Sequence, residues 1–270
     1  IVIGGGINGV GVARDASMRG LSVALFERND LAFGASGNSS GMIHGGLRYL
    51  TYDPQVTESS CRDSGHIQTI APHLLFRIPF LVPVESRRYA RILFELMDGF
   101  FEAYDGYQPL KHGKSHARLT ASEVKQLEPG IAGELVGGLT FDEWGIDGAR
   151  LCTENAVDAI ERGARVFTGC TVERIERRED TGEVMGVAYR DRHTGKAGRL
   201  KSSVVVNATG AWAPITAAIG GLAPTRARVR PGKGIHIVFD RRLTNYAIMA
   251  RTIDGRQIFV EPWENMTVVG

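Results

Sequence analysis

The sequence predicts a mixed α/β protein with a Rossmann-like dinucleotide-binding domain and a second, β-rich domain. Three observations support this fold class. Residues 1–27 read as a strand, a glycine turn, a helix and a second strand that ends on an acidic residue. Several β-rich runs separated by polar turns lie between residues 165 and 208, and the rest of the chain from residue 226 is again rich in short apolar runs. The 270 residues suffice for two modest domains.

The opening unit has the spacing of a nucleotide cradle. Gly4 permits a tight turn after the strand, Gly6 lets backbone N–H groups approach a pyrophosphate, and Gly9 lets the helix pack against the sheet. The helix N-terminus favours an anion, and Glu27, roughly 20 residues on, can accept hydrogen bonds from a ribose hydroxyl. The glycine pattern alone does not separate FAD from NAD, and an ordinary βαβ turn is the competing interpretation.

Composition excludes several classes of protein. A formal charge of +2 gives no reason to expect a nucleic-acid partner, and apolar and charged contents of 43% and 23% are typical of globular proteins. No apolar run reaches the length of a membrane-spanning helix. Cys61, Cys152 and Cys170 are far apart and form no metal-ligand pattern, so neither a metal site nor a disulfide framework is expected. The chain opens inside a strand without Met, which suggests that residues precede it.

Small residues dominate residues 34–46, just after the opening unit. Ser36, Ser40 and Gly41 in this stretch could bond phosphate or ribitol oxygens and allow close approach of a bulky polar ligand. A flexible loop is the alternative. The stretch leads into His44, Arg48 and Tyr49, so we interpret it as lining a cofactor.

The sequence GGGINGVG…ALFERNDLAFGASGNSSGMIHGGLRYL resembles the FAD-dependent glycerol-3-phosphate dehydrogenases, within the D-amino-acid-oxidase-like flavoproteins. The resemblance extends to APHLLFRIPFLVPV at residues 71–84, NATGAW at 207–212 and PGKGIHIVF at 231–239. The segment HGGLRYL is the most family-specific part of the resemblance. The resemblance implies FAD as cofactor, an FAD-binding domain of residues 1–76 and 148–224, and a substrate domain of residues 77–147 and 225–270.

The elements after the opening unit follow from patterns in the sequence. Residues 55–73 read as a helix, and residues 77–84, with two prolines, as a short strand at an edge or domain crossing. Residues 87–104 are helical, and their apolar face is interpreted as core, with a membrane- or partner-facing role as the alternative. The basic stretch 111–118 is interpreted as a solvated surface loop.

Thr120 and Glu123 form a capping-box pattern that opens a helix ending before Pro129. A short strand at 139–141 and a helix from Asp147 to Gly163 follow. The later strands are 165–167, 170–176, 184–190 and 199–208, among which we expect a three-stranded antiparallel meander, and then 226–239, 246–249, 257–261 and 266–269. The small-residue turn at 207–210 stands where open α/β sheets bind ligands.

Oxidation of glycerol 3-phosphate needs a hydride acceptor, a base and cations for the phosphate. Arg48 is the first candidate for the phosphate, because a guanidinium matches phosphate oxygens bidentately, and Tyr49 could add a donor. The resemblance assigns both to the substrate. His44 and His236 could act as base or bond the flavin, and Lys233 could lie near the flavin and stabilise its reduced form. A structural role is the alternative for each. The expected cofactor contacts are Gly4, Gly6, Gly9, Glu27, Arg28, Ser36, Ser40, Gly41, His44, Val172, Ala208 and Gly210.

The resemblance implies oxidation of sn-glycerol 3-phosphate to dihydroxyacetone phosphate by hydride transfer from C2 to FAD, with electrons passed to a quinone. The alternatives are an oxidase or dehydrogenase of another 2-hydroxy acid or an amino acid, and a non-catalytic dinucleotide-binding module. A cytoplasmic protein in peripheral contact with the membrane, and a homodimer, are further expectations. Because relatives continue beyond the equivalent of Gly270, we expect a C-terminally truncated chain.

Overall fold

The computed structural model describes residues 1–221 and 229–270, which divide into two compact units. The first comprises residues 1–41 and 147–232, and the second residues 42–146 and 233–270. The boundary expected near residue 76 therefore lies instead after Gly41, because residues 42–76 carry a helix that packs against the second unit's own elements. The expected boundary between residues 224 and 225 lies outside the described residues.

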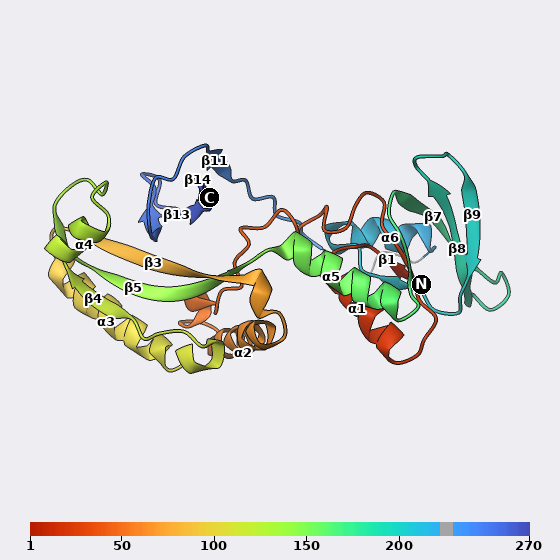
Figure 1. The fold of residues 1–270 in the computed structure, drawn as a ribbon, viewed down its shortest axis with the longest axis horizontal. Coiled ribbons are helices and arrows are strands. Elements are labelled where there is room, and N and C mark those ends of the chain that lie inside the picture. The colour runs from red at the N-terminus through yellow and green to blue at the C-terminus, as the bar shows by residue number, and fades with distance from the viewer. Residues whose placement is uncertain (222–228) are drawn as a thin grey trace. The chain divides into compact units, whose positions relative to one another are not determined.

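The first unit is built on a four-stranded parallel sheet in the order β10-β1-β2-β6. Figure 1 labels β1 of this sheet together with the helices α1, α5 and α6. Its strands and helices are β1 (Val2–Ile3), α1 (Ile7–Met18), β2 (Ala24–Phe26), α5 (Gly148–Glu161), β6 (Arg165–Phe167), β10 (Val206–Asn207) and α6 (Ala213–Ile219). Side chains alternate along β1 and β2. Val2 and Leu25 pack with α1 and α5, whereas Ile3 and Phe26 face the opposite side.

A three-stranded antiparallel meander covers that opposite side of the sheet. It consists of β7 (Cys170–Arg177), β8 (Val184–Asp191) and β9 (Ala197–Lys201), and its Val172, Ile175 and Val187 share a core with Ile3 and Phe26. The meander is confirmed as predicted. The run expected as one strand over 199–208 is divided: β9 closes the meander, and β10 joins β1 in the parallel sheet.

The second unit contains a seven-stranded sheet in the order β11-β14-β13-β12-β3-β5-β4. Its strands are β3 (Leu75–Glu85), β4 (Ala117–Thr120), β5 (Leu135–Ile146), β11 (Ile237–Phe239), β12 (Ala247–Arg251), β13 (Gln257–Trp263) and β14 (Met266–Val269). Its helices are α2 (Pro54–Ile70), α3 (Ala90–Asp105) and α4 (Ala121–Leu127), with 3-10 turns η1 (Leu47–Tyr49), η2 (Pro72–Leu74) and η3 (Gln108–Lys111). The capping box of Thr120 and Glu123 at α4 is confirmed.

The strand predicted at residues 77–84 is confirmed as β3, but its predicted place at an edge of a sheet is wrong. β3 lies inside the sheet and pairs with β5 along its whole length. Its pairing with β12 is confined to Phe80 and Leu81, which fall between Pro79 and Pro83. The prolines, which lack an N–H, therefore flank the two residues that pair with β12.

The apolar face of α3 is only partly core. Phe94, Phe101 and Tyr104 are buried against β3 and β5. Ile92 and Leu96, which belong to the apolar face that was interpreted as core, are 60% and 68% exposed. The buried stripe runs through residues 94, 101 and 104, and the neighbouring apolar stripe faces outward.

One buried carboxyl group of the sheet has no hydrogen-bond partner among the described residues. Glu261, on β13 opposite Val268, is fully buried, and neither of its carboxylate oxygens has a hydrogen-bond partner among the described residues. Burial without a partner disfavours the ionised form and raises the pKa of Glu261 from 4.5 to about 7.

Glu261→Gln is expected to flatten the pH dependence of stability. Between pH 4.5 and about 7 the unfolded chain ionises at this position while the folded chain stays protonated, so the free energy of unfolding falls as the pH rises. The wild-type free energy of unfolding should fall by roughly 3 kcal/mol, because each unit of the pKa shift is worth about 1.4 kcal/mol. Urea unfolding at pH 5 and pH 8 measures it, with the exposed Glu264→Gln as control. Equal pH dependence in wild type and Glu261→Gln would contradict the assignment.

Candidate cofactor and substrate sites

The turn after β1 is so tightly packed that two of its positions have room only for glycine. Gly4 has φ +110°, and a Cβ on it would lie 2.5 Å from the carbonyl oxygen of Ala208. A Cβ on Gly9 would lie 1.8 Å from the carbonyl oxygen of Gly4. Since backbone atoms cannot move aside cheaply, the start of α1 can approach the end of β1 only with glycine at both positions.

The N-terminus of α1 offers backbone donors. Gly6 is the N-cap and, as a glycine, has no side chain of its own to cap the helix. The Ser36 hydroxyl accepts a hydrogen bond from the Ile7 amide at 3.0 Å, and a Cβ on Gly6 would meet only this hydroxyl, at 3.2 Å. The positive end of the 12-residue helix therefore stands beside a glycine, as an anion-binding cradle requires.

Glu27 closes β2 with its carboxylate turned toward the cradle. Its two oxygens accept hydrogen bonds from the backbone amides of Gly5 and Asn29, each at 2.7 Å. A carboxylate has about four acceptor positions, so capacity remains for the hydroxyls of a ribose. These residues fit a bound dinucleotide, because glycine, donor amides and a carboxylate meet on one edge of the parallel sheet.

The remaining predicted cofactor residues take different places in the same unit. Ala208 donates its amide to the Ile3 carbonyl at 2.9 Å, so it joins the glycine turn. Gly210 has φ +56° and opens the short 3-10 turn Gly210–Trp212. Val172 lies in β7 with its side chain in the core. Ser40 and Gly41 end the first segment of the unit.

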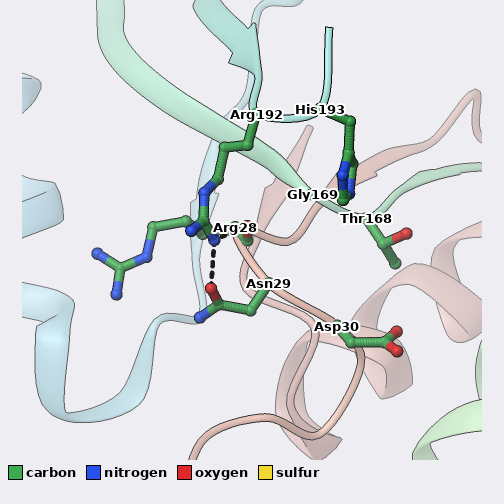
Figure 2. A pocket seen from close by; sticks show the side chains of 7 residues that line it. All are labelled: Arg28, Asn29, Asp30, Thr168, Gly169, Arg192 and His193. Atoms are coloured by element: carbon green, nitrogen blue, oxygen red, sulfur yellow. Dashed lines mark hydrogen bonds between the residues drawn. The ribbon is translucent and has the colours of Figure 1, made fainter. Parts of the chain in front are cut away.

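Arg28 lines a hollow of the first unit (Figure 2). The hollow is formed by Arg28, Asn29, Asp30, Thr168, Gly169, Arg192 and His193. The Arg192 guanidinium donates to the Arg28 carbonyl at 2.9 Å, and Figure 2 shows the Arg28 guanidinium extending away from that contact. Arg192 and His193 were missed from the sequence, because they sit in a polar hairpin turn that resembles any solvated turn.

In the second unit, His44 lies in a loop aligned with β5. The loop is held by a backbone hydrogen bond from Ile43 to Trp144 at 2.9 Å. The Nδ1 atom of His44 accepts the Gly46 amide at 3.0 Å. Although His44 keeps an exposed surface, the surrounding protein lowers its pKa through desolvation, and Arg48 and Lys111 add to this against the opposing effect of Glu143.

Arg48 and Tyr49 are brought together as predicted. They lie on η1, and Arg48 donates from Nη2 to the Tyr49 hydroxyl at 2.7 Å. The guanidinium carbon also lies 4.9 Å from the centre of the Tyr49 ring. Arg48 is exposed, so its fork can reach a ligand oxyanion without burying an unpaired charge.

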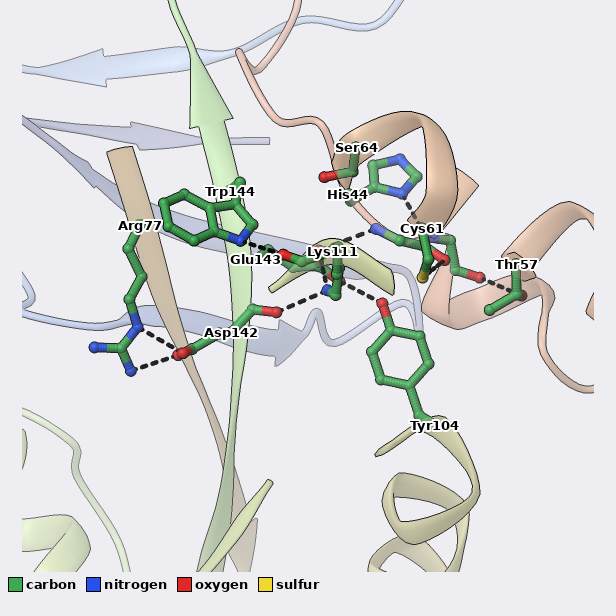
Figure 3. Close-up of polar contacts among 12 residues, drawn as sticks. His44, Thr57, Cys61, Ser64, Arg77, Tyr104, Lys111, Asp142, Glu143 and Trp144 are labelled. Atoms are coloured by element: carbon green, nitrogen blue, oxygen red, sulfur yellow. Dashed lines mark hydrogen bonds and ion pairs between the residues drawn. The ribbon is translucent and has the colours of Figure 1, made fainter. Parts of the chain in front are cut away.

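Beneath this loop lies a buried carboxylate that the sequence analysis did not identify. Glu143, on β5, accepts hydrogen bonds from Lys111 Nζ at 2.6 Å, the Tyr104 hydroxyl at 2.8 Å and the Gly45 amide at 3.0 Å (Figure 3). Lys111 is fully buried and also donates to the Asp142 carbonyl at 2.8 Å. Burial, reinforced by the Glu143 charge, raises the pKa of Tyr104 and keeps its hydroxyl protonated.

The interpretation of residues 111–118 as a solvated basic loop is wrong for Lys111, which is buried, and for residues 117–118, which begin β4; His112 and Lys114 are exposed as predicted. Lys111 forms a buried ion pair with Glu143, and the residues next to Lys111 in the sequence give no sign of this pair. His116 contacts Asp105 and Asp98, at 2.8 and 3.0 Å, and Arg118 pairs with Glu95. Burial alone would lower the pKa of His116, but the two carboxylates outweigh it and raise that pKa.

Lys233 and His236 lie in the second unit before β11. Lys233 is exposed. The His236 ring packs near Phe259, with ring centres 6.2 Å apart, and against Gly270. No hydrogen bond or ion pair of the described residues joins His236 to His44.

Residues 1–221 and 229–270 contain neither a candidate metal site nor a membrane-spanning helix. No group of three or more His, Cys, Asp or Glu side chains in this part of the chain could hold a metal ion. No helix within it is long and apolar enough to cross a membrane. Cys61, Cys152 and Cys170 are buried free thiols.

Comparison with known proteins agrees with this geometry. A family model described as "FAD dependent oxidoreductase" matches residues 1–270. The chain is 38% identical to a glycerol-3-phosphate dehydrogenase of Mycobacterium leprae (strain TN) over 277 aligned positions, covering all of this chain and 46% of that protein. It is 33% identical to an alpha-glycerophosphate oxidase of Enterococcus casseliflavus, covering 45% of it.

A solved structure has the same fold. The glycerol-3-phosphate dehydrogenase of Bacillus halodurans complexed with FAD superposes with a TM-score of 0.73 at 28% identity, covering all of this chain and 46% of that one. The chain thus spans about half the length of the curated relatives described above. The predicted fold class is confirmed, and so is FAD over NAD as the cofactor.

Lys111→Met is expected to destabilise the second unit by about 3–5 kcal/mol, because it leaves the Glu143 carboxylate buried and short of its cation. Lys114→Met is the matched control, since Lys114 is exposed in the same segment, and it should change stability by less than about 0.5 kcal/mol. Urea unfolding measures both. Equal, small effects of the two variants would show that the ion pair does not carry this part of the fold.

Proposed function

The chain belongs to the family of FAD-dependent oxidoreductases, and on that premise we propose that it oxidises sn-glycerol 3-phosphate to dihydroxyacetone phosphate. Two findings support the substrate. Relatives at 33–38% identity are named glycerol-3-phosphate dehydrogenase and alpha-glycerophosphate oxidase. The paired Arg48 and Tyr49 present an exposed cationic fork and a hydroxyl donor, which is the chemistry that a phosphate dianion needs.

Residues of the first unit would hold the nucleotide. Gly6 and the N-terminal amides of α1 suit the pyrophosphate, and Glu27 suits a ribose. When bound, FAD supplies the acceptor for the hydride that leaves C2 of the substrate. Contacts from Arg28, Ser36, Ser40, Gly41, Val172, Ala208 and Gly210 remain predictions.

Residues of the second unit would bind the substrate and handle its proton. Arg48 binds the phosphate bidentately, and Tyr49 adds one donor. Lys233 adds a second positive charge from an exposed position. His44 and His236 are the titratable groups proposed to act on the substrate hydroxyl or bond the flavin edge.

The electron acceptor proposed is a quinone, and α3 offers a surface for a membrane that contains it. Ile92, Leu93 and Leu96 are 60%, 53% and 68% exposed, and arginines at positions 87, 88 and 91 directly precede them in the sequence. An apolar stripe flanked by cations fits an anionic lipid surface. A cytoplasmic location and a homodimer stay predictions. The oxidase relatives make oxygen the competing acceptor.

The substrate is tested by anaerobic reduction of the purified flavoprotein. Glycerol 3-phosphate should bleach the oxidised flavin absorption, whereas glycerol and lactate at equal concentration should not, because neither carries the phosphate that Arg48 binds. Equal bleaching by glycerol would exclude the phosphate assignment. Absence of a flavin spectrum would exclude the enzyme in favour of a non-catalytic module.

Arg48→Ala is expected to raise KM for glycerol 3-phosphate by about 10- to 100-fold, the equivalent of losing charged hydrogen bonds worth about 1.5–3 kcal/mol. Flavin content should stay unchanged. Arg48→Lys should recover only part of the loss, because an ammonium cannot bind bidentately. Arg62→Ala on the outer face of α2 is the control. Loss of flavin in Arg48→Ala would make Arg48 a cofactor or structural residue.

The membrane proposal predicts that the protein co-sediments with vesicles containing anionic phosphatidylglycerol and that Leu93→Asp with Leu96→Asp abolishes this binding. The control is Val157→Asp, at an exposed apolar position on α5. Binding that survives in the double variant, or that needs no anionic lipid, would contradict α3 as the contact.

A further inference from the structure

The hydrogen bond at His44 determines which ring nitrogen carries the proton. The Gly46 amide lies 3.0 Å from His44 Nδ1. A backbone amide can only donate, so Nδ1 must present its lone pair, and the neutral ring must carry its proton on Nε2. We propose that His44 acts as a hydrogen-bond donor through Nε2–H and is not the group that accepts the proton of the substrate.

The peptide group between Gly45 and Gly46 is held from its other side. The Cys61 thiol lies 3.4 Å from the Gly45 carbonyl oxygen and donates to it (Figure 3). In a trans peptide the C=O and N–H point in opposite directions, so the thiol that holds the carbonyl aims the Gly46 N–H toward His44. Burial raises the pKa of Cys61 to about 11, which keeps the thiol protonated as this donor.

The flanking groups prevent this peptide from rotating. The Gly45 amide donates to Glu143 at 3.0 Å, and the Gly46 carbonyl accepts from the Thr57 hydroxyl at 3.1 Å. A Cβ on Gly45 would lie 2.3 Å from the Tyr104 hydroxyl and 2.6 Å from the Cys61 sulfur, so the loop is pressed onto its support. Turning the peptide over would break its bonds to both Cys61 and His44.

The charges that act on His44 also favour its neutral form. Desolvation lowers its pKa, the cations Arg48 and Lys111 act in the same direction, and Glu143 opposes them while neutralised by Lys111. A neutral His44 donates one hydrogen bond from Nε2 and has no free lone pair. Of the two histidines predicted to be catalytic, His236 is then left to accept the proton. The tautomer does not depend on the proposed function. The partner of Nε2–H and the statement about the substrate proton rest on it.

Nitrogen-15 NMR of histidine-labelled protein tests the tautomer without any turnover. The cross-peaks of His44 are identified by their loss in His44→Gln. Above pH 7.5 its Nδ1 should resonate as a lone-pair nitrogen and its Nε2 as a protonated one. The reverse assignment, or rapid averaging between the two tautomers, would overturn the proposal. If His44 carries its proton on Nε2 but glycerol 3-phosphate does not reduce the flavin, the proposed function is contradicted and the tautomer is not.

Kinetics test the donor role. His44→Gln keeps an N–H donor, so its kcat should stay within about tenfold of wild type, whereas His44→Ala should lose about a further tenfold or more, as expected for one lost hydrogen bond. The exposed His66→Gln is the control. If His44 were the general base, the Gln and Ala variants would lose kcat equally, and the acidic limb of the pH profile would disappear in both. That result would overturn the proposal. Flavin content monitors folding of each variant.

Discussion

The buried Glu143 carboxylate is the interaction on which the substrate-facing part of the second unit depends. A carboxylate withdrawn from water is stable only with donors around it, and here Lys111, Tyr104 and the Gly45 amide supply them. Because one donor belongs to the backbone of the loop, the same bonds that stabilise the charge fix the loop. The orientation of His44 and the placement of η1 after it follow from this arrangement.

The first unit is held to its form by sterics. At Gly4 and Gly9 two backbone segments approach more closely than a side chain would allow. The cradle stays open because no side chain projects from these positions. In the second unit, charge pairing and hydrogen bonds hold the loop in place. A nucleotide needs an open cradle of amides, whereas a small phosphate ester needs a few side chains held at fixed angles.

The parts that sequence reasoning could predict are those with local patterns. The glycine spacing, the capping box at α4 and the meander are specified by neighbouring residues. The buried pair could not be predicted this way, because Lys111 and Glu143 are 32 residues apart and Lys111 stands among basic residues. An acid between Phe141 and Trp144 in an apolar strand was the available signal. The prolines of β3 did not indicate an edge strand, because β3 pairs with β12 through only two residues and neither of them is a proline.

Hydrogen exchange at the Gly45 and Gly46 amides tests most directly whether the buried carboxylate fixes the loop. In wild type both amides should exchange as slowly as the strand amides of β5, and Glu143→Gln should accelerate Gly45 and Gly46 by at least about tenfold while leaving β5 nearly unchanged. Exchange of these two amides at the rate of the exposed backbone around Lys233 in wild type would contradict the account.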